Sequence, residues 1–229
     1  MSKSTEDLIN EILKGSYESD INGDLLNDLL EDFQKGFPVV NLLPLIKSQD
    51  RRVSRAGSWI LSELGTKACE VFHETKSLIH SFDPKVRFYY IDCILVCAGE
   101  EDGDSIKDLL SLLEDEVAFV RWRSMDALCR LSESQLLAGI SWMNSKDGGS
   151  TISYSDVQIL QDSLQERISF SHFKELVKSE NLIQKKLAII AAIRKKLEPK
   201  MVCELAEFSK DEEIIDFCKD LPSLTWVVH

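Results

Sequence analysis

The sequence has few of the residues that interrupt helices. Only five prolines and ten glycines punctuate the 229 residues, and an alternation of apolar and polar residues is nowhere sustained. A strand with one buried face needs that alternation, so a β-sheet has no convincing place in the chain. The scarcity of both features favours an all-α fold.

Long apolar runs are also missing. The longest covers the seven residues 187–193, whereas a membrane-spanning helix needs about 20. The first twenty residues are polar and acidic and lack the apolar stretch of a secretory signal. With 44% apolar residues, the chain can nevertheless bury a core. We therefore expect a cytoplasmic protein with no membrane segment.

No two of the six cysteines form a CxxC pair, and each lies within an apolar helical pattern. This spacing supports neither a disulfide framework nor a zinc site. We therefore expect free, buried thiols, no disulfide, no metal and no cofactor. Cys93 and Cys97, one helical turn apart, are the only pair that the sequence itself places close together.

The net charge of −12 is distributed unevenly. Residues 1–36 carry a net charge of −6 and residues 99–116 carry −7, whereas residues 174–200 carry +5. Two acidic surfaces of this size repel phosphate backbones and attract a cationic partner. The charge therefore disfavours nucleic acid as the main ligand and favours a basic protein. Candidate binding residues in the second acidic segment are Glu100, Glu101, Asp102 and Asp104.

A repeated pattern occupies the middle of the chain. Three segments align without gaps when they are registered on Val53, Val86 and Val120, which lie 33 and 34 residues apart. Apolar or small residues follow each valine at four, seven, eight and eleven positions, which together make one face of a helix. A turn with an aspartate and a shorter amphipathic stretch precede each segment, which predicts a repeat of helix, tight turn and second helix. The shorter stretches are residues 39–46, 68–79 and 106–113.

Two of the segments carry a Val-Arg pair after the aspartate turn, at Val86-Arg87 and Val120-Arg121, and small residues are frequent in the helix that follows. This pattern resembles the HEAT-repeat (armadillo-like) family of α-solenoids, most clearly over residues 38–132. The resemblance implies an all-α, right-handed solenoid of about five to six HEAT-like helical hairpins, formed as a single domain over residues 1–229. Farther along the chain, we expect helices near residues 183–191 and 211–221, with a loop at 144–156.

The second helices of such solenoids line the concave face, so the resemblance makes their non-core positions candidate binding residues. Aromatic, arginine and aspartate side chains together are typical of a protein-binding hot spot. An alternative is that aromatics such as Trp59 and Phe88 pack against neighbouring helices instead. The candidate positions are Arg55, Trp59, Phe88, Tyr89, Asp92, Trp122, Arg123 and Asp126.

Two sequences resemble metal-binding motifs, but neither meets the requirements of its motif. His73 and His80 are seven residues apart, which is about 10 Å along a helix and too far for one ion. An EF-hand-like run has Leu25 where the loop requires glycine. We therefore expect Asn22 or Asp24 to cap an acidic helix instead.

Trp122 and Asp126 lie four residues apart, on the same face of the predicted helix. HEAT-like alkylpurine DNA glycosylases use a Trp and an Asp in such a groove, but they need a cationic groove and this chain is acidic. The sequence contains no P-loop, GxGxxG or GxSxG motif. The favoured hypothesis is therefore a non-enzymatic module that binds a basic protein, such as an immunity protein or inhibitor that neutralises a cationic toxin. The alternative is a DNA glycosylase.

Overall fold

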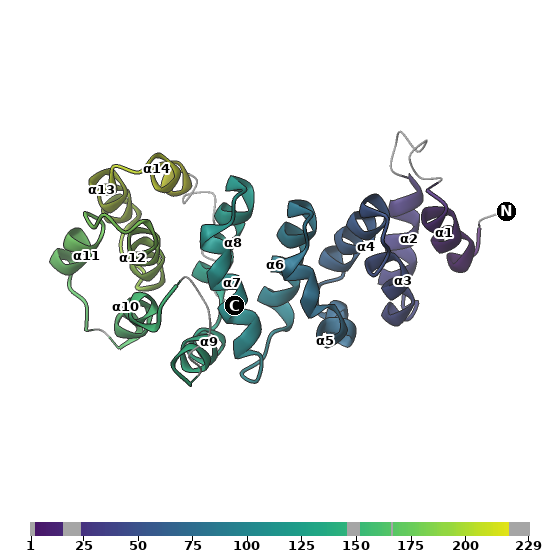
Figure 1. Cartoon of the computed structure of the whole chain (residues 1–229), viewed down its shortest axis with the longest axis horizontal. Helices are drawn as coiled ribbons and strands as arrows, with labels where there is room; N and C mark the ends of the chain where they lie inside the picture. Colours follow the sequence, from purple (N-terminus) through teal and green to yellow (C-terminus); the bar gives the residue numbers. More distant parts are fainter. Residues whose placement is uncertain (1–2, 16–23, 146–151, 166, 220–229) are drawn as a thin grey trace. The chain divides into compact units, whose positions relative to one another are not determined.

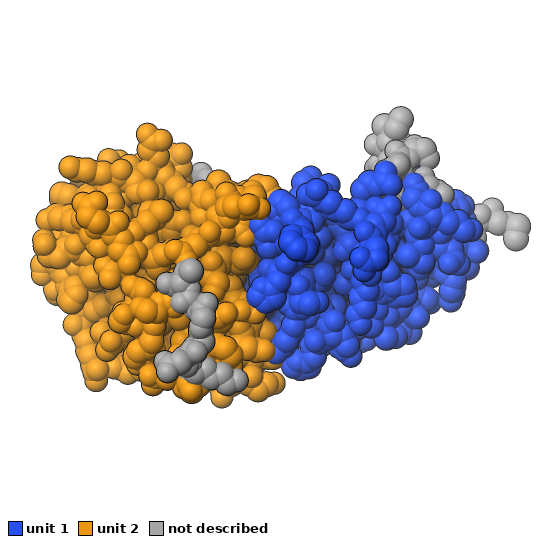
Figure 2. Space-filling model, in the orientation of Figure 1, with its two compact units in different colours: residues 1–98 blue, residues 99–229 orange. Residues whose placement is uncertain are grey.

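A computed structural model describes residues 3–15, 24–145, 152–165 and 167–219 of the chain. All secondary structure within these ranges is helical, which confirms the all-α prediction. The chain divides into two compact units, residues 1–98 and 99–229 (Figure 2). The prediction of one repeat domain over residues 1–229 stays a prediction.

Unit 1 combines regular α-helices with shorter helical pieces (Figure 1). The three stretches predicted to precede the second helices are helical, although the two in this unit are broken by 3-10 turns. The second helices, by contrast, are continuous, with 13 residues in α4 and 14 in α6. The elements are α1 (Thr5–Leu13), α2 (Asp24–Gln34), η2 (Val39–Leu42), α3 (Leu43–Ile46), α4 (Arg51–Glu63), η3 (Gly65–Val71), α5 (Phe72–Thr75), η4 (Lys76–His80) and α6 (Pro84–Cys97).

Unit 2 is built from eight α-helices and one 3-10 helix within its described residues. Both helices expected beyond residue 132 are present, as α12 and α14, although residues 220–221 of the second prediction lie outside the described ranges. The elements are α7 (Gly103–Ser111), η5 (Leu112–Glu114), α8 (Ala118–Arg130), α9 (Glu133–Ser145), α10 (Tyr154–Leu164), α11 (Phe170–Leu176), α12 (Leu182–Arg194), α13 (Pro199–Ser209) and α14 (Glu212–Lys219).

The loop predicted at residues 144–156 is shorter than expected, because α9 extends to Ser145 and α10 begins at Tyr154. A capping box starts α10: the Ser153 hydroxyl accepts the Asp156 N–H at 3.3 Å, and the Asp156 carboxylate accepts the Ser153 N–H at 3.0 Å. This reciprocal pair satisfies donors that a helix start leaves open, so the helix begins before the predicted loop ends. Residues 146–151 of the predicted loop lie outside the described ranges.

The valine register is confirmed. Val53, Val86 and Val120 lie in the first turns of α4, α6 and α8 and are at most 1% exposed. The apolar positions that follow each valine are buried as well, except Cys97, which is only half-buried. The periodicity of the sequence therefore identifies the buried face of each second helix.

The same hydrogen bonds close four of the turns between helices. In each turn, a serine hydroxyl accepts the N–H of an aspartate or asparagine two residues later. The side-chain oxygen of that second residue then accepts a backbone N–H at the start of the next helix, which satisfies a donor that has no partner within the helix. At Ser81 and Asp83, the two distances are 3.2 and 3.0 Å. The pairs are Ser48 with Asp50, Ser81 with Asp83, Ser179 with Asn181, and Ser209 with Asp211.

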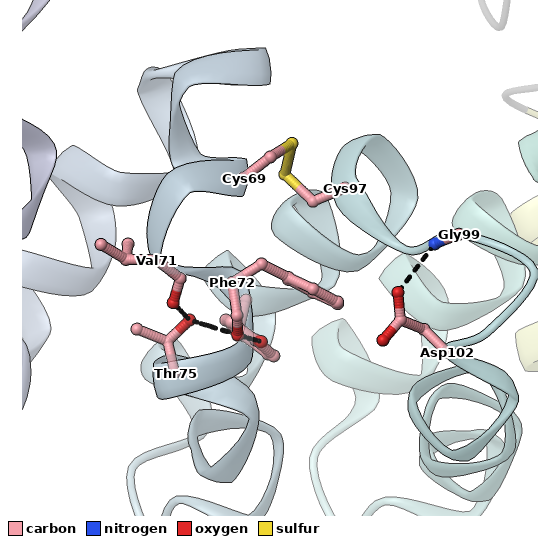
Figure 3. The surroundings of a disulfide bond; sticks show 8 residues. Cys69, Val71, Phe72, Thr75, Cys97, Gly99 and Asp102 are labelled. Carbon is pink, nitrogen blue, oxygen red and sulfur yellow. Dashed lines mark hydrogen bonds between the residues drawn. A yellow bond between two sulfur atoms is a disulfide. The ribbon is translucent and has the colours of Figure 1, made fainter.

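A disulfide joins Cys69 in η3 to Cys97 at the end of α6, with a Cα–Cα distance of 5.0 Å (Figure 3). The prediction of no disulfide is therefore wrong. The two cysteines are 28 residues apart and become neighbours only because η3 packs against α6, a contact that sequence spacing does not reveal. The expectation of buried thiols is also wrong for Cys203, which is exposed, whereas Cys93 and Cys218 are buried.

The Cys69–Cys97 bond should contribute measurably to stability. Replacing Cys97 with Ser should lower the free energy of unfolding of the oxidised protein by about 2 to 4 kcal/mol, because the cross-link restricts the unfolded chain. Thermal unfolding with and without reductant measures this loss. Cys203→Ser, at an exposed free thiol, is the matched control and should change little. Alkylation of all six cysteines before reduction would contradict the bond.

A buried lysine ties four helices of unit 2 together. Lys186 on α12 is fully buried; its Nζ donates to the Leu113 carbonyl at 2.9 Å and lies 3.4 Å from the Glu213 carboxylate. Glu213 on α14 also accepts the Nε–H of Arg121 on α8 at 2.9 Å. Burial lowers the pKa of Lys186, and the nearby Glu213 carboxylate opposes that effect. This network is stable only while the buried ammonium keeps its counter-charge.

Removing the counter-charge should therefore cost more than removing the lysine. We expect Glu213→Ala to lower the free energy of unfolding by about 3 kcal/mol, because it leaves a buried ammonium unpaired. Lys186→Met should cost about 1 kcal/mol, because mainly one hydrogen bond is lost. Chemical denaturation of both single variants and the double variant, with Glu212→Ala as the exposed control, measures these terms. Equal losses from the two single variants would contradict this account.

The pH dependence of the Glu213→Ala variant has a defined sign. The pKa of Lys186 is lowered in the folded state, so the unfolded state binds more protons between that pKa and the ordinary value of 10.5. Stability should therefore rise with pH in this window. The rise should be larger in Glu213→Ala than in the wild type and absent from the Lys186→Met/Glu213→Ala double variant.

Candidate partner-binding surfaces

In unit 1, the predicted binding residues lie on α4 and α6. Trp59, Phe88, Tyr89 and Asp92 are all half-buried. The rings of Phe88 and Tyr89 meet edge to face, with centroids 5.8 Å apart, and burial raises the pKa of the Tyr89 hydroxyl. These side chains therefore contribute to packing and also present part of their surface to solvent.

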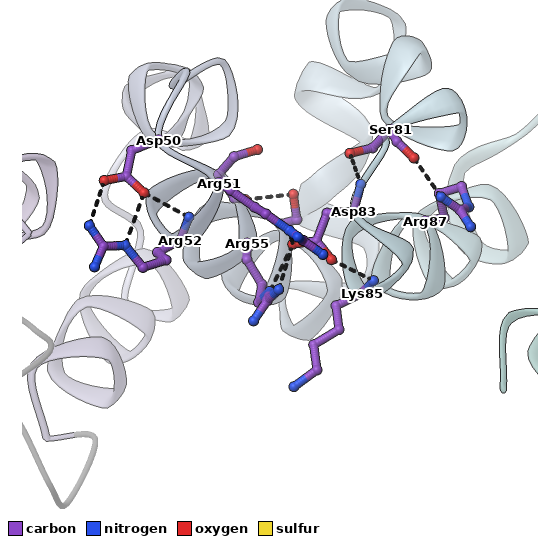
Figure 4. Close-up of polar contacts among 10 residues, drawn as sticks. Asp50, Arg51, Arg52, Arg55, Ser81, Asp83, Lys85 and Arg87 are labelled. Atoms are coloured by element: carbon purple, nitrogen blue, oxygen red, sulfur yellow. Dashed lines mark hydrogen bonds and ion pairs between the residues drawn. The ribbon is translucent and has the colours of Figure 1, made fainter. Parts of the chain in front are cut away.

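Arg55, the remaining candidate in unit 1, is held by Asp83 in the turn before α6 (Figure 4). The Arg55 Nη2 lies 2.8 Å from the Asp83 carboxylate, and the Arg51 Nε donates to the same oxygen at 2.9 Å. Asp83 is 4% exposed. Burial by itself would raise the pKa of Asp83, but hydrogen bonds from Arg51, the Lys85 amide and Arg55 outweigh it, and the pKa is lowered.

Asp83 is thus a connection between repeats, because it belongs to one helix pair and holds two arginines of the preceding one. The sequence places an aspartate in this turn but gives no sign of its partners. The arginines that it orients lie 32 and 28 residues earlier. The one sign of this proximity in the sequence is the repeat itself, because its interval of 33 to 34 residues is close to these two separations.

Replacing Asp83 with Asn should preserve the turn and remove the ion pairs. At neutral pH, we expect a loss of about 1 kcal/mol in the free energy of unfolding, a modest figure because Arg51 is largely exposed. The stabilisation that the ionised carboxylate provides is fully present above its ordinary pKa of 3.8. It is lost as the pH falls through the lowered pKa of the folded protein. Acid unfolding monitored by circular dichroism tests both expectations.

The control for this variant is Asp50→Asn. Asp50 closes the corresponding turn before α4, but among the described residues its ion-pair partner is Arg52 of its own helix, and it is more exposed than Asp83. Its replacement should cost less, with a smaller change in acid stability. Identical acid profiles for the two variants would show that the pairing of Asp83 with Arg51 and Arg55 adds nothing.

In unit 2, Trp122, Arg123 and Asp126 lie on α8, where Trp122 and Arg123 are half-buried and Asp126 is buried. Asp126 is 1% exposed, and its Oδ2 accepts hydrogen bonds from Arg123 and, at 3.2 Å, from Arg130. Trp122 meets the ring of Phe217 on α14 edge to face, at 5.6 Å. The expectation that Asp126 points into an open groove is therefore wrong, because arginines on the same helix enclose its carboxylate.

The predicted acidic residues at the start of unit 2 divide into two kinds. Glu100 and Glu101 are exposed. Asp104 is half-buried and accepts the Ser105 N–H at 2.9 Å. Asp102 is only 2% exposed and accepts the Gly99 N–H at 2.9 Å. The expectation that Asp102 belongs to the acidic surface is therefore wrong, because its carboxylate folds back to close the turn that precedes α7.

No cluster suited to a metal ion occurs in the described parts of the chain, when groups of at least three His, Cys, Asp or Glu are considered. His73 and His80 are exposed, as a surface role requires. Asp24 is the first residue of α2, and the other suggested cap, Asn22, lies outside the described residues. No helix within the described ranges is long and apolar enough to cross a membrane.

Comparison with protein-family models finds no match for this chain, and comparison with curated protein sequences finds none either.

Proposed function

We propose that this protein is a non-enzymatic binding module that captures a basic protein through acidic surfaces. The observation that carries the proposal is the position of Glu100 and Glu101. Both carboxylates are exposed just before α7, and neither has an ion-pair partner in the part of the chain that the structure describes. Exposed carboxylates of this kind raise the rate at which a cationic partner associates.

Unit 1 carries a second acidic surface on α1 and α2. Its seven described carboxylates are exposed or half-buried, and only two of them pair with lysines: Glu11 with Lys3 at 2.7 Å and Glu31 with Lys35 at 2.6 Å. Such exposed pairs are weak and leave most of the negative charge available. The carboxylates belong to Glu6, Asp7, Glu11, Asp24, Asp28, Glu31 and Asp32.

The fold supports the same class of function. We infer that the helix pairs build a right-handed HEAT-like solenoid, a scaffold that offers partners an extended surface. Three observations support this arrangement: the buried valine register, the repeated turn, and the contact of Asp83 with the preceding repeat. An acidic scaffold of this kind suits a neutraliser of a cationic protein, as an immunity protein is.

Nothing in the geometry of α8 favours the alternative, a DNA glycosylase. A catalytic aspartate must reach its substrate, whereas the Asp126 carboxylate is buried beside the guanidinium groups of Arg123 and Arg130. Trp122 likewise packs against Phe217. We therefore propose no catalytic role for either residue.

Charge reversal at Glu100 and Glu101 tests the proposed function. Wild type, Glu100→Lys/Glu101→Lys and a control, Glu207→Lys/Glu212→Lys, are immobilised, and the proteins that they retain from native lysate are quantified by mass spectrometry. We expect a basic protein that binds the wild type and the control but is depleted by the variant. Its association rate should fall as salt shortens the Debye length to about 10 Å at 0.1 M.

Two outcomes would contradict the proposal. One is a retained partner that is acidic, or whose capture is the same with all three proteins. The other is saturable retention of the wild type on a DNA column that is abolished by Asp126→Asn, which would favour the glycosylase.

A further inference from the structure

The most exposed large apolar side chain in the described residues is Phe82, whose ring is fully open to solvent at 101% relative exposure. It lies in the turn between η4 and α6, directly before Asp83. Leaving a phenylalanine in water forgoes the favourable free energy of burying its apolar ring. An exposed aromatic of this kind is a marker of recognition when its surroundings can also bind.

The turn that presents Phe82 is fixed on both sides. The Asp83 N–H donates to the Ser81 hydroxyl at 3.2 Å, and the Asp83 carboxylate accepts the Lys85 N–H at 3.0 Å. The same carboxylate is held by Arg51 and Arg55 of α4. Phe82 is therefore attached to an ordered turn, and a partner that covers it need not order the backbone first.

The side chains around this turn are mainly cationic, in contrast to the chain as a whole. Arg51 is 64% exposed and Arg52 is 56% exposed. Lys85 is exposed, has no ion-pair partner among the residues that the structure describes, and extends away from Asp83 (Figure 4). Asp50 and Asp83 supply the only carboxylates of the two turns, so cations remain in excess. We call Arg51, Arg52, Phe82 and Lys85 the cationic turn surface.

We propose that the cationic turn surface binds an acidic segment of a partner protein, in which carboxylates flank an apolar side chain. The carboxylates would pair with the Lys85 ammonium, and the exposed guanidinium groups of Arg51 and Arg52, which Asp83 and Asp50 already hold, would add to the attraction. The apolar side chain would cover Phe82. This interface is opposite in sign to the acidic surfaces of the proposed function, uses different residues and does not depend on them.

Charge and composition favour a protein over a nucleic acid as the occupant. One aromatic ring offers no platform for successive bases. A chain with a net charge of −12 also repels a long polyphosphate more strongly than a short acidic segment.

The probe for this proposal is a short fluorescent peptide in which glutamates flank a leucine and a phenylalanine. Fluorescence anisotropy measures its binding to the full chain. We expect saturable binding that weakens about tenfold or more with Phe82→Ser, and also with Arg52→Glu/Lys85→Glu. A peptide with alanines in place of the apolar pair should bind more weakly, and one with lysines in place of the glutamates should not bind.

The controls match each variant in chemistry. Phe119→Ser removes another exposed phenylalanine, at the start of α8, and Lys14→Glu/Lys35→Glu makes the same charge change elsewhere in unit 1. Both should bind the peptide as the wild type does. Unchanged thermal unfolding of Phe82→Ser, which is expected for a fully exposed side chain, separates a lost contact from a lost fold.

Three results would overturn the proposal. The first is no saturable binding of the acidic peptide up to about 1 mM. The second is tighter binding of a single-stranded oligonucleotide that the same variants abolish, which would assign the surface to nucleic acid. The third is self-association in light scattering that Arg52→Glu/Lys85→Glu removes, which would make a second copy of the chain the occupant. If the wild type binds the acidic peptide but captures no basic protein, only the proposed function is contradicted.

Discussion

A helix pair in this chain can bury its apolar face only if the turn between its helices has a fixed direction. The serine and the aspartate or asparagine in four of these turns provide that direction, because their side chains satisfy backbone donors that would otherwise face solvent or the core. Two of the turns lie in unit 1 and two in unit 2, so one local solution serves both parts of the chain. With the turns fixed, the buried stripes of α4, α6, α8 and α12 contribute the apolar surface that stabilises each unit.

Much of this fold follows from the sequence alone, because the periodicity of apolar residues reports the buried face of each helix directly. Val53, Val86 and Val120 are buried because each begins the apolar face of its helix, as their spacing predicts. The repeated turn also appears in the sequence, as a serine followed two residues later by an aspartate or asparagine. Its capping role, however, becomes clear only from its hydrogen bonds.

Two of the features that sequence reasoning missed depend on contacts between residues far apart in the chain. Helical periodicity cannot show that Cys69 meets Cys97, or that Asp83 binds two arginines of α4. It also assigns charged residues to the surface by default, which was wrong for Asp102 and Asp126. In each of these carboxylates one oxygen accepts hydrogen bonds from a nearby backbone amide or guanidinium group, which offsets part of its lost hydration.

Charge in this protein has two separate uses. The basic stretch at residues 174–200 is largely structural, because several of its cations bind carbonyl groups at the ends of helices and turns: Lys185 binds Ser209 at 2.9 Å, Lys186 binds Leu113 at 2.9 Å, and Arg194 binds Leu128 and Leu131 at 2.9 and 2.7 Å. Positive charge at helix C-termini also offsets the helix dipole. Within the described residues, the carboxylates of α1, α2 and the segment before α7 have few such partners, and these are the carboxylates for which we propose a role in recognition.

The buried Lys186 also sets an order for assembly during synthesis. Its carbonyl partner, Leu113, and its counter-charge, Glu213, are separated by 100 residues, and a chain leaves the ribosome from its N-terminus at about 5 to 20 residues per second. Helix α12 therefore emerges before the carboxylate that neutralises its buried ammonium. The Lys186–Glu213 pair of unit 2 can therefore form only after α14 has been synthesised, whereas both helices of the α4–α6 contact are complete by residue 97.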